Sequence, residues 1–146
     1  MVIALGSNLG DRLYNLRRAL HEIGTTIRIV RLSGVHETAA VDAPPGSPPF
    51  LNMALAGYTM LEPRALLDEM LSIERRLGRV RREKNGPRVI DIDLIVYGAR
   101  RIWTDGMIVP HPRAAGRAFV IDPVGECAPA VRDFLLRRLR ESRPRT

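Results

Sequence analysis

The chain has 146 residues, a length typical of one compact domain, and 45% of them are hydrophobic, which is enough to build a core. Charged residues make up 27%, so the composition excludes a chain that is disordered throughout. The 23 Lys and Arg exceed the 16 Asp and Glu by 7, which favours an anionic partner such as a nucleotide or a nucleic acid. We therefore expect residues 1–146 to form a single domain.

The only cysteine, Cys127, excludes an intrachain disulfide and a cysteine-based zinc site. A free thiol suits a reducing compartment. The first residues carry no basic segment, and no apolar run is long enough for a signal peptide or a membrane span. We therefore expect a cytoplasmic protein without a membrane partner, and we expect it to be a monomer.

The first half of the chain alternates strand and helix patterns. The expected elements are a strand over residues 2–5, a helix over 13–23 that Gly24 ends, a strand within 27–38 that breaks near Ser33, a Pro-rich loop over 43–49 and a strand over 50–60. In the last strand, Phe50 and Asn52 share one face because successive side chains alternate.

The second half begins with a helix near Pro63, a residue that suits the first helical position, and Gly78 ends this helix. A basic loop follows over residues 79–88, then a strand over 88–97, short strands at 102–103 and 107–109, and a terminal helix over 132–140. The first six elements follow the order βαββαβ, which is the ferredoxin-like arrangement. We expect an α+β sandwich, in which helices cover one face of an antiparallel sheet, with C-terminal additions.

The most informative segment is the aliphatic strand that carries Asp91 and Asp93. Because strand side chains alternate, the two carboxylates share one face, while Ile92, Leu94 and Val96 take the other. Their Cα atoms start about 6.6 Å apart, so both can converge on one cation cluster. Carboxylate oxygens suit Mg²⁺ that is held together with substrate phosphates. We expect both aspartates on the sheet face that helices leave uncovered.

An arginine-rich segment, residues 75–88, leads directly into this strand. Most charge runs are solvated loops, and that interpretation stays open. Because carboxylates alone would repel a nucleotide, arginines beside a Mg²⁺ site would bind the phosphates and neutralise charge during phosphoryl transfer. We therefore favour an arginine lid that closes over phosphates.

Several weaker signals fit the same chemistry, although each alone is more typical of a structural role. His111 lies between two prolines and, with Arg117, could form a second clamp on phosphate. Phe50 and Asn52 could stack on a planar heterocycle and read its edge, because an amide offers both a donor and an acceptor. Asn8, in a glycine-rich turn, is expected to brace neighbouring loops.

The chain resembles the 6-hydroxymethyl-7,8-dihydropterin pyrophosphokinase family over nearly its whole length. The matching segments are residues 4–10, 50–52, 74, 78–81, 86–93, 109–111 and 117–119, in the family's order. The most specific of them is the block Gly86-Pro87-Arg88-x-x-Asp91-x-Asp93, with Lys84 as the basic residue before it.

The resemblance implies transfer of the terminal diphosphate of ATP to the hydroxymethyl group of the pterin, with release of AMP, in folate biosynthesis. It implies two Mg²⁺ ions bound by Asp91 and Asp93, and it implies Arg79 and Arg88 as catalytic residues that act on the phosphates together with this pair. The remaining implied ATP contacts are Glu74, Ile92, His111 and Arg117. The implied pterin contacts are Thr38, Val41, Phe50, Asn52, Asp91 and Phe119.

The chain departs from many family members at the lid. Asn85 stands where they carry an aromatic residue, and the loop is one residue shorter, so the resemblance does not assign Arg81 or Arg82 to a phosphate. Pro112 follows His111 in place of a Tyr.

Two other functions stay open from the residues alone. A nucleic-acid-binding ferredoxin-like domain fits the net charge, but it predicts stacking aromatics on the open sheet face. This chain places Asp91 and Asp93 there and has only 5% aromatic residues, so nucleic acid is not the favoured partner. A ligand-binding domain without catalysis predicts no dependence on a metal.

Overall fold

The computed structural model describes residues 1–80 and 86–143. Its first part contains β1 (Val2–Ser7), α1 (Arg12–Ile23), β2 (Ile27–Leu32), β3 (His36–Thr38), β4 (Phe50–Thr59), α2 (Pro63–Arg76) and β5 (Asp91–Val96). The strand expected within residues 27–38 is divided into β2 and β3, and both pair with β4. The sheet order is β2-β4-β1-β5, with antiparallel pairing throughout, which confirms the ferredoxin-like fold.

Local signals set the ends of the first two helices. The Asp11 side chain accepts a hydrogen bond from the backbone N–H of Tyr14 at 3.1 Å and so caps α1, which ends before Gly24. Pro63 takes the first position of α2, where its missing N–H costs no hydrogen bond. After α2, Gly78 adopts a φ of 94°, a conformation that suits glycine and turns the chain out of the helix.

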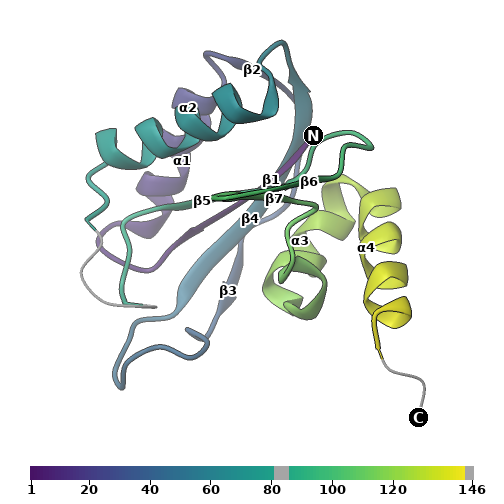
Figure 1. The fold of residues 1–146 in the computed structure, drawn as a ribbon. Helices are drawn as coiled ribbons and strands as arrows, with labels where there is room; N and C mark the ends of the chain where they lie inside the picture. The colour runs from purple at the N-terminus through teal and green to yellow at the C-terminus, as the bar shows by residue number, and fades with distance from the viewer. Residues whose placement is uncertain (81–85, 144–146) are drawn as a thin grey trace.

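The α1 and α2 helices cover one face of the sheet (Figure 1). Strand side chains such as Ile3, Leu55 and Ile92 pack there against Leu16 and Ile73 of the helices. These side chains are almost completely shielded from water, so their burial supplies the main hydrophobic stabilisation of this half of the molecule.

The C-terminal additions are β6 (Ile102–Thr104), β7 (Met107–Val109), η1 (Ala114–Gly116), α3 (Ala118–Cys127) and α4 (Pro129–Glu141). Short strands β6 and β7 were expected, and they form a separate two-stranded sheet. The sequence did not predict α3, because Pro123 and Gly125 lie inside it and both disfavour a helix. Hydrophobic burial of Val120 and Val124 holds the helix in place despite them.

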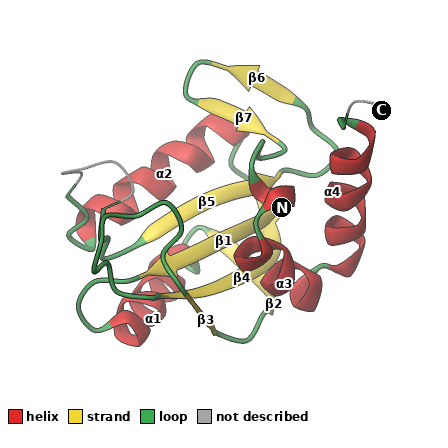
Figure 2. Ribbon diagram, turned by 90° about the horizontal axis from the view of Figure 1, so that it is seen from below, coloured by secondary structure: helices red, strands yellow, loops and turns green. Residues whose placement is uncertain are grey.

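The second face of the sheet is not bare, in contrast to the expectation. Helix α3 packs on it, α4 packs against α3, and side chains of both helices form a second core with the end of β5 (Figures 1 and 2). Val96, expected on the face opposite the aspartates, contributes to this second core. The cause is a register shift: Leu94 pairs with Ile3 but Val96 pairs with Val2, so Ile95 is an extra residue that reverses the alternation.

The length and hydrophobicity of the described helices bear on whether any of them could cross a membrane. Within residues 1–80 and 86–143, none of them combines the length and the hydrophobicity that a membrane span requires.

The second core generates a stability prediction. Leu135 of α4 is 2% exposed, so Leu135→Ala should lower the free energy of unfolding by about 2–5 kcal/mol through lost burial and the cavity left behind. Urea unfolding followed by circular dichroism measures this change. The control Leu32→Ala, at a leucine that is 49% exposed, should stay within about 0.5 kcal/mol. An unchanged unfolding midpoint for Leu135→Ala would show that α4 is not part of the folded core.

Candidate active site

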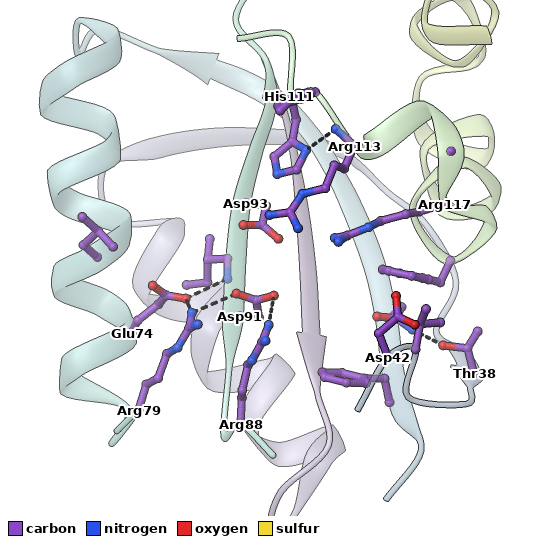
Figure 3. Close-up of a pocket in the computed structure, with 18 of the residues that line it drawn as sticks. Thr38, Asp42, Glu74, Arg79, Arg88, Asp91, Asp93, His111, Arg113 and Arg117 are labelled. Carbon is purple, nitrogen blue, oxygen red and sulfur yellow. Dashed lines mark hydrogen bonds and ion pairs between the residues drawn. The ribbon is translucent and has the colours of Figure 1, made fainter. Parts of the chain in front are cut away.

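A cleft with a volume of about 1060 Å³ opens where β5 carries its aspartates (Figure 3). All the site residues that the sequence predicted line it: Thr38, Val41, Phe50, Asn52, Glu74, Arg79, Arg88, Asp91, Ile92, Asp93, His111, Arg117 and Phe119. The structure therefore brings together residues from β3, β4, α2, β5 and the segment leading into α3. The lid residues Arg81, Arg82, Lys84 and Asn85 lie outside the described residues.

The two aspartates stand over the smallest side chains of the neighbouring strand. Asp93 pairs with Ala4 of β1, and Asp91 pairs with Gly6. A Cβ atom at Gly6 would lie 3.0 Å from the Asn52 Oδ1 atom and 3.3 Å from the Phe50 ring. Glycine at this position therefore keeps the floor of the cleft open between the aspartates and the Phe50–Asn52 wall.

An ion network joins α2, the arginines Arg79 and Arg88, and β5. The Arg79 guanidinium contacts the Glu74 carboxylate and donates to Asp91 Oδ1 at 2.8 Å, while Arg88 Nη1 lies 3.0 Å from Asp91 Oδ2 (Figure 3). Glu74 is 3% exposed and also accepts a hydrogen bond from the backbone N–H of Ile92 at 3.0 Å. Both arginines assigned to phosphate are thus paired with Asp91 in this structure.

Burial is the largest influence on the pKa values of Glu74 and Asp93. It raises the pKa of the Glu74 carboxyl, against the opposing effect of Arg79. Burial, and then the negative charges of Asp91 and Glu74, raises the pKa of Asp93 from 3.8 to about 7. Among the residues the structure describes, no hydrogen bond or ion pair joins the Asp93 carboxylate to another group.

The donor set fits a divalent cation that is shared with a phosphate ligand. Asp91 and Asp93 offer carboxylate oxygens on one side of the strand, and Asp93 has no competing partner in the described residues. Residues 1–80 and 86–143 contain no group of three or more His, Cys, Asp or Glu side chains that could hold a metal ion alone. Mg²⁺, which keeps water and binds through one or two carboxylates plus phosphates, suits such an incomplete protein site.

A second basic wall faces the aspartates. The backbone N–H of His111 donates to Ile95 O at 2.8 Å, and His111 Nδ1 accepts from the backbone N–H of Arg113 at 3.2 Å. Burial, followed by the charges of Arg117 and Arg113, lowers the pKa of His111 and so favours the neutral ring. Because Nδ1 is the acceptor, the proton of the neutral ring lies on Nε2. Figure 3 shows Arg113 and Arg117 pointing into the cleft on the side of Asp93.

The third wall combines an amide with aromatic rings. Asn52 is 6% exposed, and its Nδ2 atom donates to Thr38 Oγ1 at 2.6 Å. Phe50 lines the cleft beside Asn52, and Phe119 lines it from α3, with the Arg117 guanidinium 5.5 Å from the Phe119 ring centroid. A polar edge between aromatic faces can hold a planar heterocycle.

Asn8 braces the site, as expected from its turn. Its side chain is fully buried, its Oδ1 accepts from the Arg88 backbone N–H at 2.7 Å, and its Nδ2 donates to Pro48 O at 3.1 Å. One amide therefore fixes both the start of the Asp strand and the Pro-rich loop.

The sequence did not single out several cleft residues. Leu67 of α2 is half-buried and lines the cleft with Leu71. Helical spacing places Leu67 at the margin of the core face, where periodicity alone does not separate core from cleft. Arg113 is close to His111 in the sequence, but only the folded chain after Pro112 shows that its side chain enters the cleft.

The raised pKa of Asp93 generates a pH-dependent prediction. An unfolded Asp has a pKa of about 3.9, so protonated Asp93 stabilises the fold fully below that value, and this stabilisation is lost as the pH rises towards 7. At pH 8 without divalent cations, Asp93→Asn should raise the free energy of unfolding by about 2–4 kcal/mol. At pH 4 the change should be small.

Urea unfolding at both pH values measures this difference. Asp105→Asn, at an exposed aspartate in the β6–β7 turn, should behave alike at pH 4 and pH 8. A loss of stability at pH 8 for Asp93→Asn would contradict a half-buried carboxylate that lacks a partner among the described residues.

Comparisons with known proteins identify relatives of the chain. The family model for 7,8-dihydro-6-hydroxymethylpterin-pyrophosphokinase (HPPK) matches residues 2–129. The 2-amino-4-hydroxy-6-hydroxymethyldihydropteridine pyrophosphokinase of Bacillus subtilis is 41% identical over 127 residues, which cover 85% of this chain and 75% of that protein. The mitochondrial folate synthesis bifunctional protein of Arabidopsis thaliana is 43% identical over 125 residues, 85% of this chain and 22% of that protein.

A crystal structure described as HPPK-DHPS in complex with substrates has a TM-score of 0.65, with 97% of this chain and 44% of that chain covered. At 12% identity, this likeness concerns the fold alone. The chain spans between 22% and 66% of the length of several curated relatives it matches. By the match over residues 2–129 and the identity to these relatives, the chain belongs to the 7,8-dihydro-6-hydroxymethylpterin-pyrophosphokinase family.

Proposed function

We propose that the chain transfers diphosphate from ATP to the hydroxymethyl group of 6-hydroxymethyl-7,8-dihydropterin and releases AMP, as a step of folate synthesis. The observation that carries this proposal is the pair Asp91 and Asp93 in a cleft whose other charged residues are mainly arginines. A carboxylate pair suits a cation, and the arginines suit the phosphates bound to that cation.

The reaction needs little covalent work from the protein. The pterin hydroxyl oxygen bonds to the β-phosphorus of ATP, the bond from that phosphorus to the oxygen bridging to the α-phosphorus breaks, and AMP leaves with the bridging oxygen while the hydroxyl proton is released. The chain's task is to align the two substrates and to stabilise the charge that develops on the phosphates.

Asp91 and Asp93 would hold the cations, for which we propose two Mg²⁺ ions. When bound, Mg²⁺ supplies neutralisation of the phosphate charge. Arg79 and Arg88 then leave Asp91 for phosphate oxygens, because a guanidinium pairs with phosphate as readily as with carboxylate. From the facing wall, Arg117 and the neutral His111, with its Nε2–H, donate further hydrogen bonds to the nucleotide.

Glu74 is the least expected member of the nucleotide set, because an anion would repel a phosphate. Its carboxylate is nevertheless buried, and it binds Arg79 and the Ile92 N–H. We assign Glu74 to the positioning of Arg79, and Ile92 to the floor beneath the nucleotide.

The pterin would lie on the third wall. The Asn52 amide reads the polar edge of the ring system, with Thr38 fixing the orientation of that amide. Phe50 and Phe119 stack on the ring faces, and Val41 closes the border of the cleft. Asp91, which would help to hold the cations, would also border the pterin, where the hydroxymethyl group must meet the β-phosphate.

We further propose that residues 1–146 act as one domain and as a monomer in the cytoplasm. The buried free thiol of Cys127 supports a reducing compartment.

The identity of the released nucleotide tests the proposal. Purified protein with ATP, Mg²⁺ and the hydroxymethyl pterin should release AMP in amounts equal to the pterin diphosphate formed, and EDTA should stop the reaction. Chromatography of the nucleotides measures both products. Release of ADP, or no turnover with the pterin supplied, would contradict the assignment.

A pair of matched variants tests whether the reaction depends on the Asp strand. Asp93→Ala should lower kcat by about 100-fold or more, because charge stabilisation at the phosphates is lost. Asp105→Ala, at the exposed turn, should keep the wild-type rate. Equal rates for both variants would refute the role of Asp93.

A further inference from the structure

A glutamate outside the cleft ties two of its walls together. Glu126 lies near the end of α3, and both of its carboxylate oxygens are engaged with a distant part of the chain. Its Oε1 accepts from the backbone N–H of Gly34 at 2.8 Å, and its Oε2 lies 2.7 Å from His36 Nε2. Gly34 fits this approach closely, since a Cβ atom there would lie 3.3 Å from Glu126 Oε1.

The segment held by Glu126 leads straight into the proposed pterin wall. Gly34 lies in the break between β2 and β3, and His36 opens the three-residue strand β3. In that strand His36 pairs with Asn52 of β4, and Thr38 ends the strand and accepts the Asn52 side-chain hydrogen bond. So short a strand has few backbone hydrogen bonds of its own, so its position depends on contacts at its ends.

Helix α3, which carries Glu126, is held in place by its packing in the second core. Val120, Val124 and Cys127 anchor α3 in the second core, each less than a tenth exposed. The same helix presents Phe119 to the cleft in its first turn. A contact between the end of α3 and the start of β3 therefore links the helix that carries Phe119 to the strand that carries Thr38.

An ordinary surface ion pair would have little effect, because exposed pairs contribute about 0–1 kcal/mol. The Glu126 side chain is itself 43% exposed, but its carboxylate makes two contacts to one segment, because it accepts both from a backbone N–H and from a ring nitrogen at short distances. Acceptance from the Gly34 N–H also lowers the pKa of Glu126, which keeps it charged at neutral pH.

We propose that Glu126 is a positioning residue for the planar substrate: by holding Gly34 and His36, it fixes β3, and through Thr38 it holds the Asn52 amide at the edge of a flat heterocycle that stacks on Phe119. The identity of that heterocycle as a pterin rests on the proposed function. Glu126 itself does not line the cleft, so it acts through β3 and not by touching substrate.

Steady-state kinetics test the proposal by separating binding of the two substrates. Glu126→Ala should raise KM for the pterin about tenfold and leave KM for ATP and kcat within about twofold, because only the β3 wall is released. Glu126→Gln should stay close to wild type, since its amide oxygen still accepts from Gly34 and its amide N–H can donate to His36. His36→Ala, which keeps the Gly34 contact, should lie between them.

The matched control is Asp133→Ala, which removes an exposed carboxylate of α4 that pairs with the adjacent Arg132. It should change none of the kinetic constants. A fall in kcat with an unchanged pterin KM, or a Glu126→Gln defect as large as that of Glu126→Ala, would overturn the proposal.

An NMR measurement decides the same point without activity. In ¹⁵N spectra, Glu126→Ala should speed hydrogen exchange at the Gly34 amide and shift the Asn52 side-chain amide signals, whereas Asp133→Ala should do neither. Unchanged Asn52 signals in Glu126→Ala would overturn the proposal even if the pterin KM rose. If the wild-type protein released no AMP with the pterin, the proposed function would fail, while the NMR comparison would still decide the role of Glu126.

Discussion

The site depends on one constraint: Arg79 stands between two carboxylates that the fold partly removes from water. Glu74 cannot be buried as an anion without a cation beside it, and Arg79 supplies that cation from just beyond the turn that ends the same helix. The second contact of Arg79, to Asp91, joins α2 to the Asp strand, and Arg88 completes the charge balance on Asp91. Asp93 remains without a partner in the described residues, which leaves it to an incoming cation.

The fold was predictable wherever a local pattern dictates it. Alternation and helical spacing, with Gly24 and Pro63 as boundaries, were enough to predict the βαββαβ order. The hydrophobic pattern of each element is contained in a short stretch of sequence. The second core was not predictable. It depends on the extra residue Ile95, which only the pairing of β5 with β1 reveals, and on a helix that contains Pro123 and owes its stability to packing against the sheet.

The site was predictable to the extent that its chemistry is concentrated in the sequence. Two aspartates in an aliphatic strand are costly, and the arginines that precede them point to phosphate. The assignment of residues far apart in the chain to the same site came from the family resemblance. The pairing of Arg79 with Glu74 was not visible, because the two side chains meet only after the turn at Gly78. Nor could a linear pattern show that Glu126 reaches Gly34, since 92 positions separate them.

The central claim is that the arginines leave Asp91 when a metal-bound nucleotide arrives. A crystal structure with Mg²⁺ and a non-hydrolysable ATP analogue tests it most directly. We predict Mg²⁺ at about 2.1 Å from carboxylate oxygens of both Asp91 and Asp93, with Arg79 and Arg88 moved to phosphate oxygens. A nucleotide bound elsewhere, or bound with both arginines still on Asp91 and no metal on Asp93, would contradict the account.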